Sequence, residues 1–82
     1  MTKEQHKRAN DLSELIDKYS GDLEDMERMR KMLKNGTLKS LVLSGAAINI
    51  VLPLDFSITT IEESIGLINS RLSLLEREYN EL

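Results

Sequence analysis

Hydrophobic residues recur in steps of three and four through the first part of the chain, where good helix formers dominate. We therefore predict a helix from about residue 2 to residue 35. The segment Ser20-Gly21-Asp22 weakens the pattern, because a mid-helix glycine costs roughly 0.5–1 kcal/mol relative to alanine. One continuous or kinked helix is still expected, ending at Asn35-Gly36, where glycine can adopt the left-handed conformation. The apolar stripe of this helix consists of Leu12, Ile16, Tyr19, Leu23, Met26 and Leu33.

The spacing of this stripe calls for an apolar residue at position 30, where the sequence has Arg30. A basic residue there has three interpretations: a device that sets the register, a partner of a facing carboxylate, or a sign that the stripe shifts to Met29 and Met32. The sequence does not decide among them.

The C-terminal part carries the strongest pattern, a strict alternation of three- and four-residue steps between apolar side chains. This is the spacing of a coiled-coil heptad. We predict a helix from about residue 57 to residue 82, with Thr59 to Glu62 as a capping box and Asp55 or Ser57 as alternative caps. The heptad seam consists of Ile58, Ile61, Ile65, Ile68, Leu72, Leu75, Tyr79 and Leu82.

This seam is the predicted oligomer interface, with Ile58, Ile61, Ile65, Ile68, Leu72, Leu75 and Tyr79 as its residues. Leu67 and Leu74 lie seven residues apart on a neighbouring line and widen the apolar face. A wide face favours a homo-oligomeric helical bundle over a two-stranded coil. The alternative is that the seam packs against the first helix of its own chain.

Between the helices, residues 37–52 are rich in aliphatic and β-branched types, with Ser44-Gly45 between two runs. This predicts a β-hairpin. A two-residue turn at Ser44-Gly45 places Leu41 opposite Ile48, and a longer loop places Leu43 there instead. A lone hairpin is marginal in water, so it should lie on the helices or pair with a neighbouring subunit.

The whole chain, residues 1–82, is predicted to be a single α+β domain that is mainly helical. A chain this short buries only about 60–65% of its unfolded surface. With no cysteine and a single histidine, self-association is the expected source of further stability. The longest apolar stretch is too short for a membrane helix and the first residues are polar, so a cytoplasmic protein without a membrane partner is expected.

The sequence contains few side chains that could perform catalysis. We predict that the protein is not an enzyme and has no catalytic residue, no cofactor and no metal. The only imidazole, His6, lies in a polar N-terminal turn, and the acidic residues have the spacing of a solvated helix face. Each glycine stands alone, so there is no phosphate-binding loop. A net charge of −3 argues against a nucleic-acid partner for this chain.

The charge distribution is more informative than the total. From Arg28 to Leu54 the chain has five basic residues and no acidic one. One interpretation is that cations stabilise the helix C-terminus and protect a strand edge. The other is an anion site, in which basic side chains hold a phosphate or carboxylate and neutral groups add hydrogen bonds. The candidate residues are Arg28, Arg30, Lys31, Lys34, Thr37, Lys39, Ser40 and Asn49.

The layout of a charged helix, a short hairpin and a heptad-bearing helix resembles small cysteine-free proteins of phage and prophage accessory regions. Some of these proteins are oligomeric anti-defence sponges that sequester signalling nucleotides. The resemblance implies a homo-oligomer that binds a small anionic ligand or a host protein. The alternative function is a protein–protein interaction or structural assembly module that uses the C-terminal heptad helix.

Overall fold

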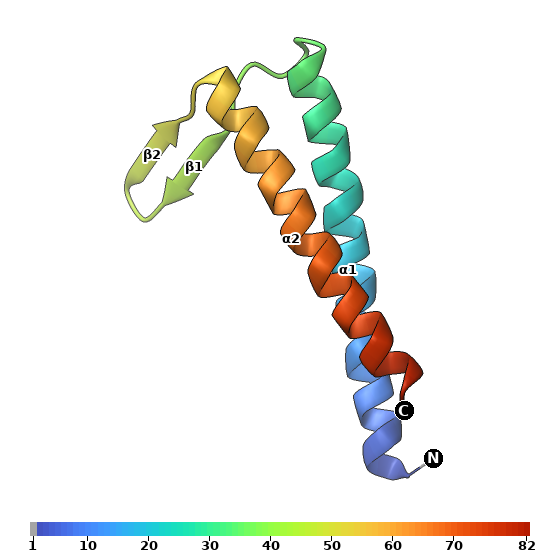
Figure 1. Ribbon diagram of the computed structural model, residues 1–82. Coiled ribbons are helices and arrows are strands. Elements are labelled where there is room, and N and C mark those ends of the chain that lie inside the picture. The colour runs from blue at the N-terminus through green and yellow to red at the C-terminus, as the bar shows by residue number, and fades with distance from the viewer. Residues whose placement is uncertain (1) are drawn as a thin grey trace.

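A computed structural model describes residues 2–82 as a helix, a β-hairpin and a second helix. The elements are α1 (Lys3–Lys34), β1 (Val42–Gly45), β2 (Ile48–Val51) and α2 (Leu54–Asn80). The two helices lie side by side, and the hairpin projects from one end of the pair (Figure 1). The mainly helical α+β architecture is therefore confirmed.

Helix α1 is continuous and has well-formed ends. At its start, the Thr2 hydroxyl accepts a hydrogen bond from the Gln5 backbone at 3.1 Å, and the Gln5 side chain accepts one from the Thr2 backbone at 2.8 Å. The helix runs through Gly21 without a break, as predicted. It ends at Lys34, followed by Asn35 as the C-cap and by Gly36 at a φ of 82°. The predicted stop at Asn35-Gly36 is confirmed.

Helix α2 begins earlier than predicted, at Leu54, and the predicted capping box is wrong. Pro53 takes the N-cap position with a φ of −55° and no side-chain cap. Its carbonyl accepts the first helical hydrogen bond, from the Ser57 backbone at 2.8 Å. Proline is tolerated at this position because its backbone is extended, with a ψ of 157°, and its missing N–H has no partner in the helix, so the helix begins directly after it and Thr59 lies within the helix.

The core lies between the two helices and is formed by one chain. Leu33 of α1 clusters with Ile61 and Ile65 of α2. Leu12, Leu72 and Leu75 are also buried. The heptad seam thus packs against α1 of the same chain, and its contact with another chain stays a prediction. The half-buried residues around the central cluster are Leu23, Met26, Met29, Leu38, Leu41 and Ile58.

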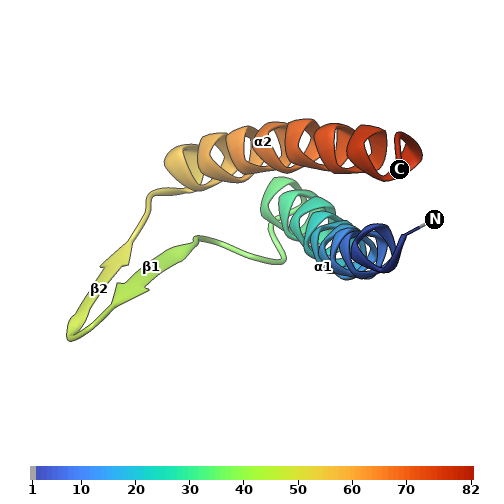
Figure 2. The ribbon, with the colours of Figure 1, turned by 90° about the horizontal axis from the view of Figure 1, so that it is seen from below.

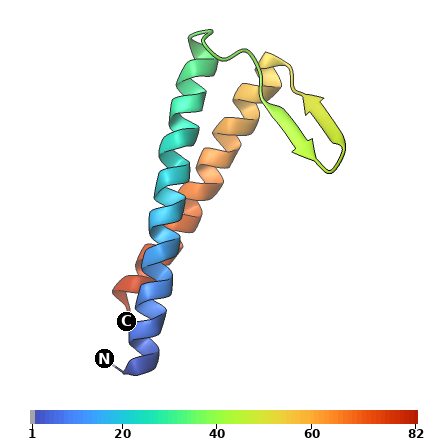
Figure 3. The same cartoon turned by 180° about the vertical axis from the view of Figure 1, so that it is seen from behind.

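The helices are antiparallel, as two ion pairs at opposite ends show. Arg8 near the start of α1 donates to the Glu78 carboxylate near the end of α2 at 3.0 Å. Lys34 at the end of α1 lies 3.8 Å from the Glu62 carboxylate near the start of α2. The start of α1 and the end of α2 therefore lie at the same end of the molecule, away from the hairpin (Figure 3).

The hairpin has a register that differs from both predicted ones. Val42 pairs with Val51, Leu43 with Ile50, Ser44 with Asn49 and Gly45 with Ile48. The turn is Ala46-Ala47, with Ala46 at a φ of 45°. Strand β1 starts at Val42, because Leu38 and Leu41 pack against the helical core and residues 37–40 lie outside the ladder. The shift is by an even number of residues, so the side chains of the paired residues 42–45 and 48–51 keep their predicted faces.

Candidate functional site

The hairpin extends away from the helical pair (Figure 2), and within residues 2–82 its strands pack against neither helix. Five of its apolar side chains are at least half exposed, from 52% for Val42, Leu43 and Ile50 to 65% for Val51 and 67% for Ile48. Of the two expected placements, packing of the strands on the helices of the same chain is therefore wrong, and pairing with a neighbouring subunit stays a prediction. Apolar side chains exposed in a contiguous group mark an interaction site.

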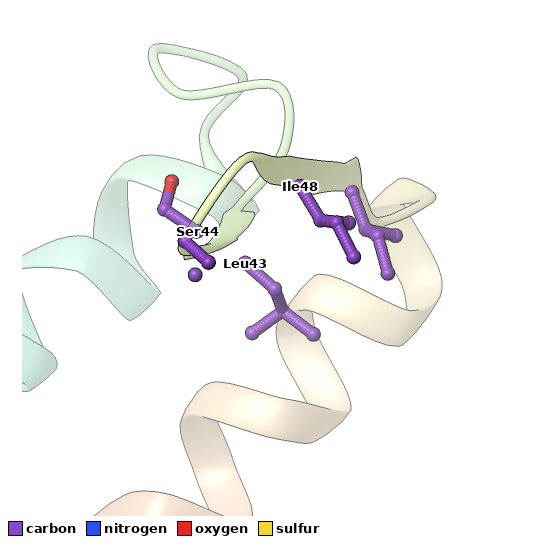
Figure 4. Close-up of a pocket in the computed structure, with 6 residues that line it drawn as sticks. Leu43, Ser44 and Ile48 are labelled. Carbon is purple, nitrogen blue, oxygen red and sulfur yellow. The ribbon is translucent and has the colours of Figure 1, made fainter.

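The two faces of the hairpin differ in chemistry. One, which we call the apolar face, carries Leu41, Leu43, Ile48, Ile50 and Leu52. The other, the mixed face, carries Val42, Ser44, Asn49 and Val51. The close-up shows Leu43 and Ile48 on one side of the ribbon and Ser44 on the other (Figure 4). An interface would form more favourably on the apolar face, because no polar group would lose water there.

The apolar face is continuous with the core of the molecule. At its base, Leu41 packs against the core cluster and Leu52 is half-buried. The Leu52 backbone donates to the Leu41 carbonyl at 2.9 Å, which extends the ladder by one pair beyond the strands. Toward the tip, Leu43, Ile48 and Ile50 line an open hollow of ≈ 500 Å³. The apolar core between the helices is thus continuous with an exposed apolar surface on the hairpin.

Ser57 fixes the hairpin to the start of α2. Its side chain is fully buried, and its hydroxyl accepts a hydrogen bond from the Leu41 backbone at 2.9 Å while it donates to the Leu52 carbonyl at 3.2 Å. One side chain therefore holds both strands at their base. The sequence predicted Ser57 only as an alternative cap. The signal that could have identified it is its place four residues before Ile61, on the buried line of the helix.

A second exposed apolar surface runs along α2. Phe56, Leu67 and Leu74, which we call the outer stripe, are 59%, 73% and 60% exposed. Leu67 and Leu74 were expected to widen the apolar face of this helix, and the packing with α1 leaves them uncovered. A smaller hollow of ≈ 180 Å³ lies where Leu67 and Ile68 approach Tyr19 and Arg71.

The predicted oligomer interface is largely occupied within the chain. Ile61, Ile65, Leu72 and Leu75 are buried and Ile58 and Ile68 are half-buried, whereas Tyr79 is 44% exposed. Contacts of these residues with another chain stay a prediction. The surfaces still open for association are the hairpin and the outer stripe.

The predicted anion-site residues fall into two groups. Arg28, Arg30, Lys31 and Lys34 lie on the last turns of α1, where Arg28 is 3.7 Å from the Asp25 carboxylate and Lys34 pairs with Glu62. Residues Thr37, Lys39 and Ser40 lie in the connection to β1. Asn49 is on β2, and no contact between the strands and α1 brings it to the helical cations. Arg30 is half-buried, and Met29 takes its place against the core, which favours the interpretation that the stripe shifts.

Titratable side chains are scattered over the described residues. His6 is exposed on the first turns of α1. Within residues 2–82 no three His, Asp or Glu side chains are grouped so that they could hold a metal ion. Neither α1 nor α2 has an apolar stretch long enough to span a membrane.

Comparisons of the chain with protein-family models, with curated proteins and with solved structures found no match. The helix–hairpin–helix architecture is shown by the structure itself. The relation to phage proteins stays a prediction.

Proposed function

We propose that this chain is a non-enzymatic protein–protein interaction module, with the hairpin as its docking element. The observation that carries this proposal is the outer part of the apolar face, where Leu43, Ile48 and Ile50 are at least half exposed and contact neither helix through the backbone. The interaction surface differs from the one expected from the heptad pattern, because α1 already occupies the seam.

The structure of the hairpin supports a docking role in a second way. A two-stranded hairpin without support is marginal in water, since it buries little apolar surface. Here, Ser57 and the Leu41–Leu52 hydrogen bond hold its base in one position. A rigid base with an uncovered apolar tip is suited to insertion against a partner surface, because little conformational entropy remains to be lost on binding.

Site-specific photo-crosslinking in cells tests this function. A photoreactive amino acid replaces Ile48, which is 67% exposed near the hairpin tip. The control position is Ser13, which is exposed on α1. We expect a discrete crosslinked protein from position 48 and none from position 13. Absence of any crosslink at position 48, with the protein folded and abundant, would contradict the proposed function.

The second candidate function is binding of a small anion at the end of α1. It is favoured by the acid-free stretch from Arg28 to Leu54 and by Arg30, Lys31 and Lys39, which form no ion pair within residues 2–82. Helix C-termini also attract cations, so these residues alone do not require a ligand.

Native mass spectrometry of the purified chain tests this candidate. A co-purified anion should be retained by the wild type and lost from the Arg30→Gln/Lys31→Gln variant. The Lys3→Gln/Lys7→Gln variant removes the same charge from the opposite end of α1 and should retain the anion. Equal retention by both variants, or a wild type without a bound anion, would exclude this site.

A further inference from the structure

We propose that the partner of the hairpin is a second copy of this chain, and that two apolar faces meet around a two-fold axis. This inference rests on the proposed docking role of the hairpin. It adds the identity of the partner and the face that is used.

The first argument is surface area. The chain exposes 6245 Å², whereas a compact monomer of this size exposes about 5,000 Å². The excess of about 1,200 Å² is larger than the about 800 Å² that each partner contributes to a stable interface. The radius of gyration is also larger than that of a compact chain of this length: it is 16.5 Å, whereas a compact chain has about 12 Å. The elongated chain therefore leaves more surface uncovered than a compact monomer does, and a second copy would cover part of it.

The second argument is the lack of charge on the docking surface. No residue from Ser40 to Leu54 carries a charge. A surface that selects a different protein commonly uses charge to choose among partners. A two-fold contact places the same patch on both subunits, so an uncharged apolar patch is complementary to itself. Leu43, Ile48 and Ile50 of one copy would meet the same residues of the other.

The third argument is the small core of the single chain. Within residues 2–82, only six apolar side chains are buried: Leu12, Leu33, Ile61, Ile65, Leu72 and Leu75. Small domains without disulfides or metals commonly gain stability from association. Because the apolar face continues the core outward, covering it with a second copy would join the two cores through the hairpins.

Sedimentation velocity over a range of protein concentrations tests this inference. The wild type should sediment as a dimer. The Ile48→Lys/Ile50→Lys variant places two charges on each apolar face and should raise the dissociation constant by about 100-fold or more, because like charges would meet across the axis. The control is Asn49→Lys/Val51→Lys, which adds the same charge to the mixed face of the same strand and should remain a dimer.

The variants keep the test independent of folding. Strand β2 makes no backbone contact with either helix, and Ile48 and Ile50 are at least half exposed, so the helical circular dichroism of the first variant should match that of the wild type. A monomeric wild type would overturn the inference, and so would equal dissociation of the two variants. If position 48 then crosslinks to a different protein, the docking function stands without the second copy. If it crosslinks to nothing, both proposals fail.

Discussion

At the scale of single residues, the hydroxyl of Ser57 decides how the hairpin is attached. Without it, the Leu41 N–H and the Leu52 carbonyl would be part-buried at the base of the strands with no side-chain partner. An unsatisfied buried polar group costs about 1–3 kcal/mol, which exceeds the net gain from an ordinary hydrogen bond. Ser57 therefore contributes more to the fold than its size suggests.

We predict that Ser57→Ala lowers the free energy of unfolding by about 1–3 kcal/mol. Urea denaturation followed by circular dichroism measures this change. The matched control is Ser70→Ala, whose exposed hydroxyl donates to the Gly66 carbonyl of its own helix at 3.1 Å. That substitution should change the stability by less than about 0.5 kcal/mol. Equal effects of the two substitutions would mean that the Ser57 hydrogen bonds do not hold the hairpin base.

At the scale of elements, the stability of the two helices depends on side-chain packing, whereas the stability of the turn after α1 depends on its backbone conformation. Gly21 and Gly36 illustrate the difference, since a Cβ atom at either position meets nothing within 4 Å. Gly21 lies in the middle of α1, where glycine only increases the entropy lost on folding. Gly36 has a φ of 82°, which a residue with a side chain adopts at a cost.

Alanine at these two positions should therefore have opposite effects. Gly21→Ala should raise the free energy of unfolding by about 0.5–1 kcal/mol, whereas Gly36→Ala should lower it by about 1 kcal/mol. Chemical denaturation of the two variants under one set of conditions checks both signs. A loss of stability in Gly21→Ala would indicate that α1 is not continuous through residue 21.

The helices are predictable from the sequence because the periodicity of the apolar residues indicates which side of each helix is buried. The three- and four-residue steps select Leu12, Leu33, Ile61 and Ile65, and all four are buried. The helix against which the seam packs is not predictable, since the same spacing allows packing against a second chain or against a neighbouring helix of the same chain. The hairpin register also escapes prediction, because it depends on Leu38 and Leu41, whose burial is a tertiary effect.

The candidate site is predictable only in part. The alternation of side chains places Leu43, Ile48 and Ile50 on one face, but nothing in the pattern indicates that this face is uncovered. The cations at the end of α1 are evident from the sequence, whereas the pairing of Lys34 with Glu62 requires the antiparallel arrangement.

At the scale of the whole molecule, the chain is elongated and thin, with extents of 50 × 30 × 16 Å. Its helical pair is only two helices deep, and the hairpin projects to one side of the pair without adding core (Figure 1). The ion pair of Arg8 with Glu78 is about half exposed, so it contributes at most about 1 kcal/mol. Association is the remaining way to increase the buried apolar area.

We predict that the thermal midpoint of the wild type rises with protein concentration, because a dimer of folded chains stabilises the folded state by mass action. Differential scanning calorimetry at several concentrations measures the shift. The Ile48→Lys/Ile50→Lys variant should unfold at a midpoint that does not depend on concentration. A constant midpoint for the wild type would mean that the folded chain does not associate.

The hydrogen bond of 2.9 Å between Leu52 and Leu41 brings the two ends of the hairpin together at the top of the helical pair. The path from α1 to α2 is consequently short, and residues 42–51 form a side loop that the helices do not need for their own pairing. A chain in which a tight turn replaces this loop should still form the antiparallel helix pair. The molecule can thus be regarded as a complete helical hairpin that carries an exchangeable β insertion.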